Sequence, residues 1–240
     1  MPMTPKLIVF DLAGTTVDGS DQVPFSLQRA LADHHVNVPF EDANALMGTP
    51  KPFAIRQLLV KHAPDDQPVT DEMVGQVHSR FVQLMIDYYQ NSPEVKEKPG
   101  VSEFFRTLKT HHIKVAVDTG FDRQITDVIL KRMRWQERQL MDASVASDEV
   151  PQGRPHPDMI FRAMQLTGIE DIATVAKVGD TVSDMRQGQA AGCAWTIGVT
   201  TGACTEAELQ QEPHTHLIGQ VAELAAIFGL PEETVLENSI

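Results

Sequence analysis

The second half of the chain alternates strand-like and helix-like segments, and this pattern constrains the fold more than any other feature of the sequence. Short apolar runs typical of buried strands occupy residues 113–120, 142–147, 174–180 and 194–200. Segments with helical spacing of apolar residues occupy 101–112, 122–133, 157–168 and 183–192. Strands that alternate with helices of about a dozen residues predict βαβ units and therefore a parallel sheet.

Another strand-like run, "KLIVF" at Lys6–Phe10, has the same character but stands apart from the others. Helical patterns at 25–36, 42–48, 52–63 and 71–90 follow it, and then a polar, proline-bearing stretch at 92–100. The economical interpretation is an α/β protein with a doubly wound, Rossmann-like parallel-sheet core. We expect residues 1–19 and 93–240 to form this core, and residues 20–92 to form a helical cap domain inserted after the first strand.

Charge and cysteine content limit the class of partner. The net charge of −13 argues against nucleic acid or an anionic membrane surface, because both bind basic patches. Cys193 and Cys204 have neither metal-ligand spacing nor a disulfide pattern. The sequence shows no signal-like segment and no apolar run long enough to span a bilayer. These observations predict a cytoplasmic protein with a small-molecule substrate, and they leave open whether it forms a homodimer.

Chemically active residues follow the predicted strands. In open α/β sheets the ligand site lies beyond the carboxyl ends of the strands, so residues at these ends are expected to meet. They are Asp11 after the first strand, Thr119 and Gly120 after the second, Arg154 after the third, and Asp180 with Asp184 after the fourth.

These residue types suit phosphoryl chemistry. Carboxylates that converge from different strands, here Asp11 and Asp180, form an oxygen-rich site suited to Mg²⁺. The Asp11 carboxylate can also attack phosphorus and form an aspartyl-phosphate. Thr15, Thr119 and the backbone amides of "AGTT" can hold phosphate oxygens. Arg154 can offset the charge of a transferring phosphoryl group.

The four motifs "DLAGTTVD", "DTG", "GRPHP" and "KVGDTVSDM" occur in one chain and in this order. Together they resemble the signatures of the haloacid-dehalogenase-like hydrolases, and the resemblance covers nearly the whole chain, including the helical insert. It implies a Mg²⁺-dependent hydrolase in which Asp11 is the nucleophile, Arg154 is catalytic and Asp184 has a supporting role.

Position 13 departs from the phosphatases of this superfamily. There the residue two positions after the nucleophile is usually a second aspartate, which protonates the departing alkoxide. Here it is Ala13, whose backbone carbonyl can still bind Mg²⁺ together with Asp11 and Asp180 but which has no proton to donate. General acid catalysis contributes about 10²–10⁴-fold to such a reaction. Either the protein is a weak phosphatase, or its leaving group needs no acid.

The second possibility matches a known branch of the superfamily. "DLAGTTVD" is similar to the first motif of the phosphonoacetaldehyde hydrolases, and "MGTPK" is similar to their cap segment. The resemblance implies that Met47 and Gly48 contact the substrate and that Lys51 forms a Schiff base with the aldehyde. The imine then accepts the electrons of the broken carbon–phosphorus bond, so no alkoxide forms. From its position alone, Lys51 would lie in an exposed loop between helices.

Three positions differ from the phosphonoacetaldehyde hydrolase pattern. Ala54 replaces a histidine, Phe121 replaces a tyrosine, and Asp21 stands about where that family has a cysteine. The substrate is therefore predicted to be phosphonoacetaldehyde or a related phosphonate. Two alternatives remain: a cap-bearing phosphatase of a small phosphorylated metabolite, and a non-catalytic phosphoacceptor or scaffold protein.

Overall fold

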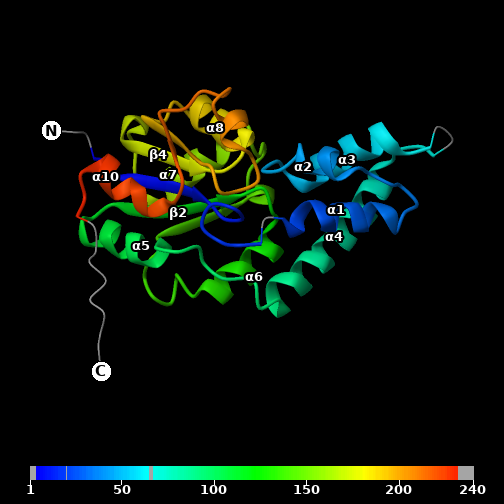
Figure 1. The fold of residues 1–240 in the computed structure, drawn as a ribbon, viewed down its shortest axis with the longest axis horizontal. Helices are drawn as coiled ribbons and strands as arrows, with labels where there is room; N and C mark the ends of the chain where they lie inside the picture. The colour runs from blue at the N-terminus through cyan, green and yellow to red at the C-terminus, as the bar shows by residue number, and fades with distance from the viewer. Residues whose placement is uncertain (1–3, 20, 65–66, 232–240) are drawn as a thin grey trace.

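The computed structural model of the protein describes residues 4–19, 21–64 and 67–231, and its centre is a parallel β-sheet (Figure 1). The sheet has six strands in the order β3-β2-β1-β4-β5-β6, and every neighbouring pair is parallel. The strands are β1 Leu7–Asp11, β2 Lys114–Thr119, β3 Ala143–Ala146, β4 Val175–Gly179, β5 Trp195–Val199 and β6 His216–Ile218. The predicted α/β class and parallel sheet are confirmed.

Helices fill the connections between the strands. Those between β1 and β2 are α1 Gln22–Ala32, α2 Phe40–Asn44, α3 Lys51–His62, α4 Asp71–Asn91 and α5 Val101–Thr110. Those that follow β2 are α6 Arg123–Met133, α7 Asp158–Thr167, α8 Val182–Ala191, α9 Glu206–Leu209 and α10 Leu224–Phe228. None of the helices in the described part of the chain combines the length and apolar character needed to cross a bilayer.

The first four residues of the central strand β1 are apolar because helices cover both faces of the sheet. Ile8 and Phe10 belong to the core that includes α5, where the rings of Phe10 and Phe105 lie 5.0 Å apart. Leu7 and Val9 point to the other face and pack in the core formed with α7. A strand buried on both faces reads as a continuous apolar run, as "LIVF" does here.

The strand order reverses around β1, which pairs with β2 on one side and with β4 on the other. The carboxyl ends of these strands therefore lie together, the usual position of a ligand site in an open α/β sheet. The register places Asp11 directly beside Asp118. Asp180 follows the last residue of β4 at the same edge.

Helices α1 to α4 lie at one end of the molecule, beside the sheet (Figure 1). Helix α4 packs against α1 and α3, and it also packs against α6. Arg132 of α6 fixes the end of α4, because its guanidinium donates to the backbone oxygens of Tyr89 at 2.9 Å and Ser92 at 2.6 Å. The division into a core and a cap stays a prediction. Its boundary at residue 20 and its ends at 1–3 and 232–240 lie outside the described residues.

Candidate active site

The loop after β1 presents Asp11 at the edge of the sheet. The Thr16 hydroxyl donates to the Asp11 carbonyl oxygen at 2.8 Å, and the Thr16 amide donates to the Leu12 oxygen at 2.9 Å. Gly14 has a φ of +99°, and a Cβ at this position would lie 2.2 Å from Oδ2 of Asp180. This glycine thus permits both the turn and the close approach of the Asp180 carboxylate.

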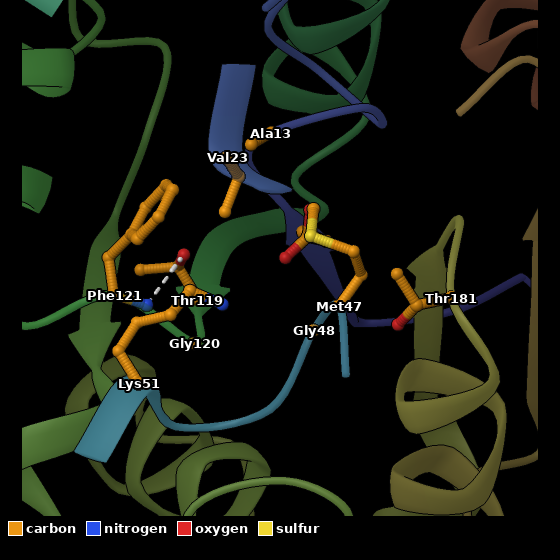
Figure 2. A pocket seen from close by; sticks show the side chains of 10 residues that line it. Ala13, Val23, Met47, Gly48, Lys51, Thr119, Gly120, Phe121 and Thr181 are labelled. Atoms are coloured by element: carbon orange, nitrogen blue, oxygen red, sulfur yellow. Dashed lines mark hydrogen bonds between the residues drawn. The ribbon is translucent and has the colours of Figure 1, made fainter. Parts of the chain in front are cut away.

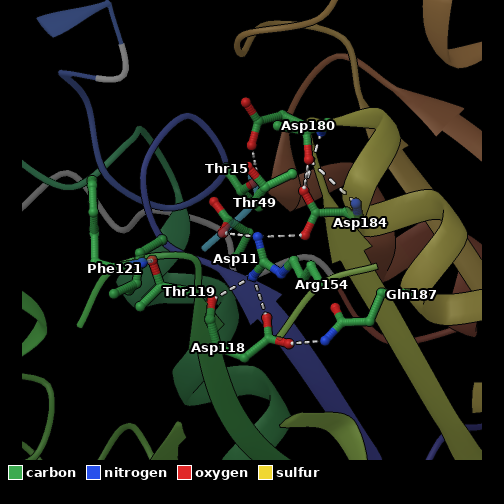
Figure 3. A network of polar contacts seen from close by, with 12 residues as sticks. Asp11, Thr15, Thr49, Asp118, Thr119, Phe121, Arg154, Asp180, Asp184 and Gln187 are labelled. Atoms are coloured by element: carbon green, nitrogen blue, oxygen red, sulfur yellow. Dashed lines mark hydrogen bonds and ion pairs between the residues drawn. The ribbon is translucent and has the colours of Figure 1, made fainter. Parts of the chain in front are cut away.

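Arg154 lies at the centre of a buried network of charges (Figure 3). Its Nη1 is 2.6 Å from Oδ1 of Asp11 and 3.0 Å from Oδ1 of Asp184, and its Nη2 is 2.5 Å from Oδ1 of Asp118. Lys177 completes the network through ion pairs with Asp118 and, at 3.0 Å, with Asp184. Asp11, Arg154 and Asp184 were all expected at this edge, and in the structure Arg154 contacts both carboxylates.

Asp118 and Lys177 were missed by the sequence analysis. Both had a signal in the sequence: Asp118 directly precedes the strand-end residue Thr119. Lys177 is a charged residue inside the otherwise apolar strand "VAKVG". A buried charge usually has a partner, so a lysine in a buried strand indicates a carboxylate nearby.

The charges at this edge do not balance. Four aspartates are buried there, Asp11, Asp118, Asp180 and Asp184, and the network contains two cations, Arg154 and Lys177. Fully ionised, these six groups carry −4 + 2 = −2. Lys177 contacts Asp118 and Asp184, so the uncompensated negative charge lies on Asp11 and Asp180.

The pKa shifts of the aspartates show that the excess negative charge lies at Asp11 and Asp180. Burial raises the pKa of Asp11 to about 8, against the opposing charge of Arg154. Burial and the Asp184 charge raise the pKa of Asp180 to about 6. Burial also disfavours ionisation of Asp118, but Arg154 and Lys177 outweigh it and hold the pKa of that carboxyl below its usual value. A divalent cation beside Asp11 and Asp180 would remove the imbalance, so the donor set fits Mg²⁺.

Another group of carboxylates is also close enough to hold a metal. One ligand oxygen from each of Asp11, Asp118 and Asp184 lies within 4.8 Å of the others. The Arg154 guanidinium already contacts all three, and Lys177 contacts two of them, so this group has two cationic partners without a metal. Asp180 is held differently: its oxygens accept from the Thr15 hydroxyl and from the Ala203 amide, each at 2.7 Å. The metal set of Asp11, the Ala13 carbonyl and Asp180 stays a prediction, supported by this difference.

A small pocket opens over Asp11 (Figure 2). In the view, the side chains of Lys51 and Phe121 lie on one wall and those of Met47 and Thr181 on the other. The lining residues are Asp11, Ala13, Val23, Met47, Gly48, Lys51, Thr119, Gly120, Phe121 and Thr181.

The pocket brings together most of the predicted site. Arg154, Asp180 and Asp184 do not line it, and Arg154 and Asp184 belong instead to the charge network around Asp11. Thr15 is also fully buried outside the lining, with its hydroxyl donated to Asp180. In this structure the Thr15 hydroxyl orients the Asp180 carboxylate, and its predicted contact with phosphate stays a prediction.

The segment from Met47 to Pro50 closes against the strand-end loops. Gly48 has a φ of +76°, and a Cβ there would lie 2.3 Å from the Thr181 hydroxyl oxygen. A Cβ on Gly120 would lie 2.8 Å from the Gly48 oxygen and 2.7 Å from the Thr49 oxygen. The two backbones meet at distances that only glycine allows, and this contact encloses the pocket.

Lys51 corrects one expectation. It is the first residue of α3 rather than part of a connecting loop, and it is only 2% exposed. Its Nζ donates to the Thr49 carbonyl oxygen at 3.2 Å and lies 5.5 Å from the centre of the Phe121 ring. Burial lowers the pKa of Lys51 to about 8, although the Asp11 charge opposes the shift.

The positions that differ from the phosphonoacetaldehyde hydrolase pattern have distinct environments. Ala54 is fully buried in α3, one turn after Lys51 begins the helix. Phe121 supplies the ring under the lysine ammonium group. Asp21 is exposed at the start of α1 and does not line the pocket.

Comparison with known proteins gives consistent results. The family model for haloacid dehalogenase-like hydrolases matches residues 8–198. A phosphonoacetaldehyde hydrolase from Bacillus cereus (strain G9842) is 30% identical over 257 aligned residues, covering 99% of this chain and 96% of the relative. The corresponding protein of Bacillus mycoides (strain KBAB4) is 32% identical, with 84% of this chain and 78% of the relative covered.

Solved structures share the fold. A phosphonoacetaldehyde hydrolase-like protein from Oleispira antarctica superposes with a TM-score of 0.82 at 21% identity, covering 95% of this chain and 92% of the other. CbbY from Rhodobacter sphaeroides, solved with phosphate, superposes with a TM-score of 0.78 at 19% identity, covering 95% of this chain and all of the other.

Proposed function

This chain belongs to the haloacid dehalogenase-like hydrolases and is a hydrolase, and on that premise we propose that it cleaves the carbon–phosphorus bond of phosphonoacetaldehyde or a related small phosphonate. One observation carries the proposal. A buried lysine with neutral partners, Lys51, lines the same small pocket as Asp11, while Ala13 leaves that pocket without an acid for an alkoxide.

The proposed reaction begins at Lys51. Its neutral amine attacks the aldehyde carbon of the substrate, and loss of water gives a protonated imine. A pKa of about 8 leaves a useful fraction of this amine unprotonated near neutral pH. The Phe121 ring below Nζ tolerates both the ammonium ion and the neutral amine, because its face attracts cations without donating or accepting a proton.

Asp11 then attacks phosphorus. The carbon–phosphorus bond breaks, its electron pair moves onto the imine to give an enamine, and Asp11 carries the phosphoryl group. Water hydrolyses the aspartyl-phosphate, and protonation and hydrolysis of the enamine release the aldehyde from Lys51. Because carbon leaves as an enamine, Ala13 is sufficient at a position where phosphatases need an acid.

The remaining residues bind and orient. Arg154 offsets charge beside Asp11, and Thr119 and Gly120 at the end of β2 face the pocket where phosphoryl oxygens would lie. Met47 and Gly48 cover the substrate and exclude water. Mg²⁺, when bound by Asp11, the Ala13 carbonyl and Asp180, supplies the positive charge that this edge lacks.

A phosphatase of a small metabolite is the second candidate. It is favoured by Ala54 and Phe121, because neither can shuttle a proton to the imine as the family's histidine and tyrosine could. A scaffold without catalysis is set aside, since the chain is a hydrolase.

Borohydride trapping distinguishes the two enzymatic candidates. Borohydride added during turnover of phosphonoacetaldehyde should reduce the imine and leave an adduct on the peptide that contains Lys51. Lys61 lies on the same helix but is 61% exposed, so Lys61→Arg is the matched control and should still be labelled at Lys51. Labelling spread over exposed lysines, or none, would favour the phosphatase.

A further inference from the structure

We propose that Asp118 is a positioning residue that holds the Arg154 guanidinium in the orientation needed at Asp11. The proposal rests on the phosphoryl transfer at Asp11 described above, but it does not depend on whether the leaving atom is carbon or oxygen. Asp118 is not in the pocket lining, so it acts through Arg154 and not on substrate.

Asp118 binds one end of the guanidinium twice. Nη2 of Arg154 donates to the backbone oxygen of Asp118 at 2.7 Å and to its Oδ1 at 2.5 Å. Nε of Arg154 is buried without a hydrogen-bond partner among the described residues. The guanidinium is a rigid plane, so fixing Nη2 also fixes Nη1, which lies 2.6 Å from Oδ1 of Asp11.

Asp118 is itself held on its other side. Gln187 of α8 donates to Oδ2 of Asp118 at 2.8 Å, and Lys177 contacts Oδ1. The Oε1 atom of Gln187 is buried without a partner in the described part of the chain. The Gln187 side chain thus donates to Asp118 although its own oxygen has no hydrogen bond. The favourable contact with the Asp118 carboxylate therefore outweighs the cost of leaving the amide oxygen unpaired.

This arrangement has a consequence for catalysis. Asp11 has to direct a carboxylate oxygen at phosphorus, and a displacement of about 1 Å in such a group can lower a rate by about 10²-fold. Arg154 fixes the carboxylate, and Asp118 prevents Arg154 from rotating toward Asp184, which also contacts Nη1. Asp118 therefore serves the geometry of the nucleophile from outside the pocket.

The test is a double-mutant cycle with Asp118→Asn and Arg154→Lys. Asparagine has the shape of the aspartate side chain but no charge. Lysine has the charge of arginine but lacks the two terminal nitrogens of the guanidinium. We expect Asp118→Asn to lower kcat for p-nitrophenyl phosphate by about 10²-fold with little change in KM. In the Arg154→Lys background, Asp118→Asn should cause almost no additional loss, because the guanidinium that Asp118 positions is already absent.

Asp142→Asn is the matched control. Asp142 also accepts from two lysines, Lys109 at 2.6 Å and Lys114 at 3.1 Å, but it precedes β3 and lies away from the strand ends that carry the site. This variant should keep activity within about 2-fold of wild type. An equal loss in Asp142→Asn, or losses that multiply in the double mutant, would overturn the proposal.

Two further measurements guard against unfolded variants and against failure of the proposed function. Gln187→Met removes one contact to Asp118 and should give a smaller loss that also vanishes in the Arg154→Lys background. Binding of orthovanadate, measured by calorimetry, should weaken in parallel with kcat. If phosphonoacetaldehyde is not cleaved but this coupling persists, only the carbon–phosphorus assignment fails; additive effects on vanadate binding contradict the role of Asp118 itself.

Discussion

At the scale of single residues, the environment of Lys51 sets the pH dependence of the proposed reaction. The neutral amine is the reactive form, and burial places its pKa at about 8. As pH rises through 8 the neutral fraction increases, so kcat/KM for phosphonoacetaldehyde at saturating Mg²⁺ should rise up to about pH 8 and then level off. Mg²⁺ bound beside Asp11 would keep its carboxylate ionised despite the raised pKa, so under the same saturating Mg²⁺ the profile for p-nitrophenyl phosphate, which does not use the amine, should lack this limb. Identical profiles for both substrates would count against the amine.

Asp11→Asn tests the nucleophile. We expect turnover of every substrate to fall below detection, because an amide cannot form the acyl phosphate. The fold should persist, since burial already disfavours the charged Asp11 carboxylate and the change removes that charge. Rates from stopped assays and the midpoint of thermal unfolding provide the two readouts. Near-wild-type hydrolysis would show that Asp11 is not the nucleophile.

Residues at the ends of predicted strands could be placed in the site from the sequence, because parallel strands end at the same edge of the sheet. Asp11 and Arg154 were predicted from strand ends, and the structure brings them 2.6 Å apart. The burial of Lys51 could not be predicted in the same way. It depends on the start of α3 at Lys51 and on contact with Phe121, which is distant in the sequence and follows β2. The hydrogen bond from the Thr15 hydroxyl to Asp180 was also not predictable, because the two residues are 165 positions apart in the chain.

At the scale of elements, the contact between the Met47–Pro50 segment and the strand-end loops should control activity. Gly48→Ala places a Cβ 2.3 Å from the Thr181 hydroxyl oxygen in a left-handed backbone, so the pocket should open and kcat/KM should fall by at least about 10-fold. Gly168→Ala is the control, because Gly168 has a similar φ of +70° and no atom within 4 Å. It should lower stability by about 1 kcal/mol and leave activity unchanged. Equal activity losses in both variants would contradict the role of this contact.

Most elements of the core were predictable from sequence because each has one dominant signal. The strands β1 to β5 are mainly apolar runs, and the long helices show one apolar face. The end of the chain was missed: β6 is three residues long and begins with an exposed histidine, and α9 and α10 have four and five residues. Such short elements depend on the neighbouring strand and core for stability, so their own sequence carries little signal.

At the scale of the whole molecule, the charge imbalance predicts that Mg²⁺ stabilises the fold as well as supporting activity. The four buried aspartates and two cations sum to −2, and a bound divalent ion brings this to zero. Saturating Mg²⁺ at about 100 times Kd should stabilise the wild type by about 2.7 kcal/mol, seen as a rise in the unfolding temperature. Chelation should reverse the rise and abolish turnover.

Asp180→Asn separates this metal set from the one around Arg154. If Asp180 is a ligand, the variant should lose most of the Mg²⁺-induced rise in unfolding temperature, while Asp118→Asn should keep it. The reverse result would place the metal among Asp11, Asp118 and Asp184. The sequence could not decide between these sets, because the contacts of Arg154 with three of the four aspartates form only in the folded structure.

The central claim is that Lys51 replaces the acid missing at Ala13, and Lys51→Arg tests it most directly. Arginine keeps the positive charge but stays protonated, so it cannot form an imine. The measurement is the ratio of phosphonoacetaldehyde cleavage to p-nitrophenyl phosphate hydrolysis in wild type and variant, since nitrophenolate leaves without an acid. We predict that this ratio falls by several orders of magnitude, with ester hydrolysis changed far less. Equal losses on both substrates would show that Lys51 only binds phosphate or supports the structure, and would contradict the account.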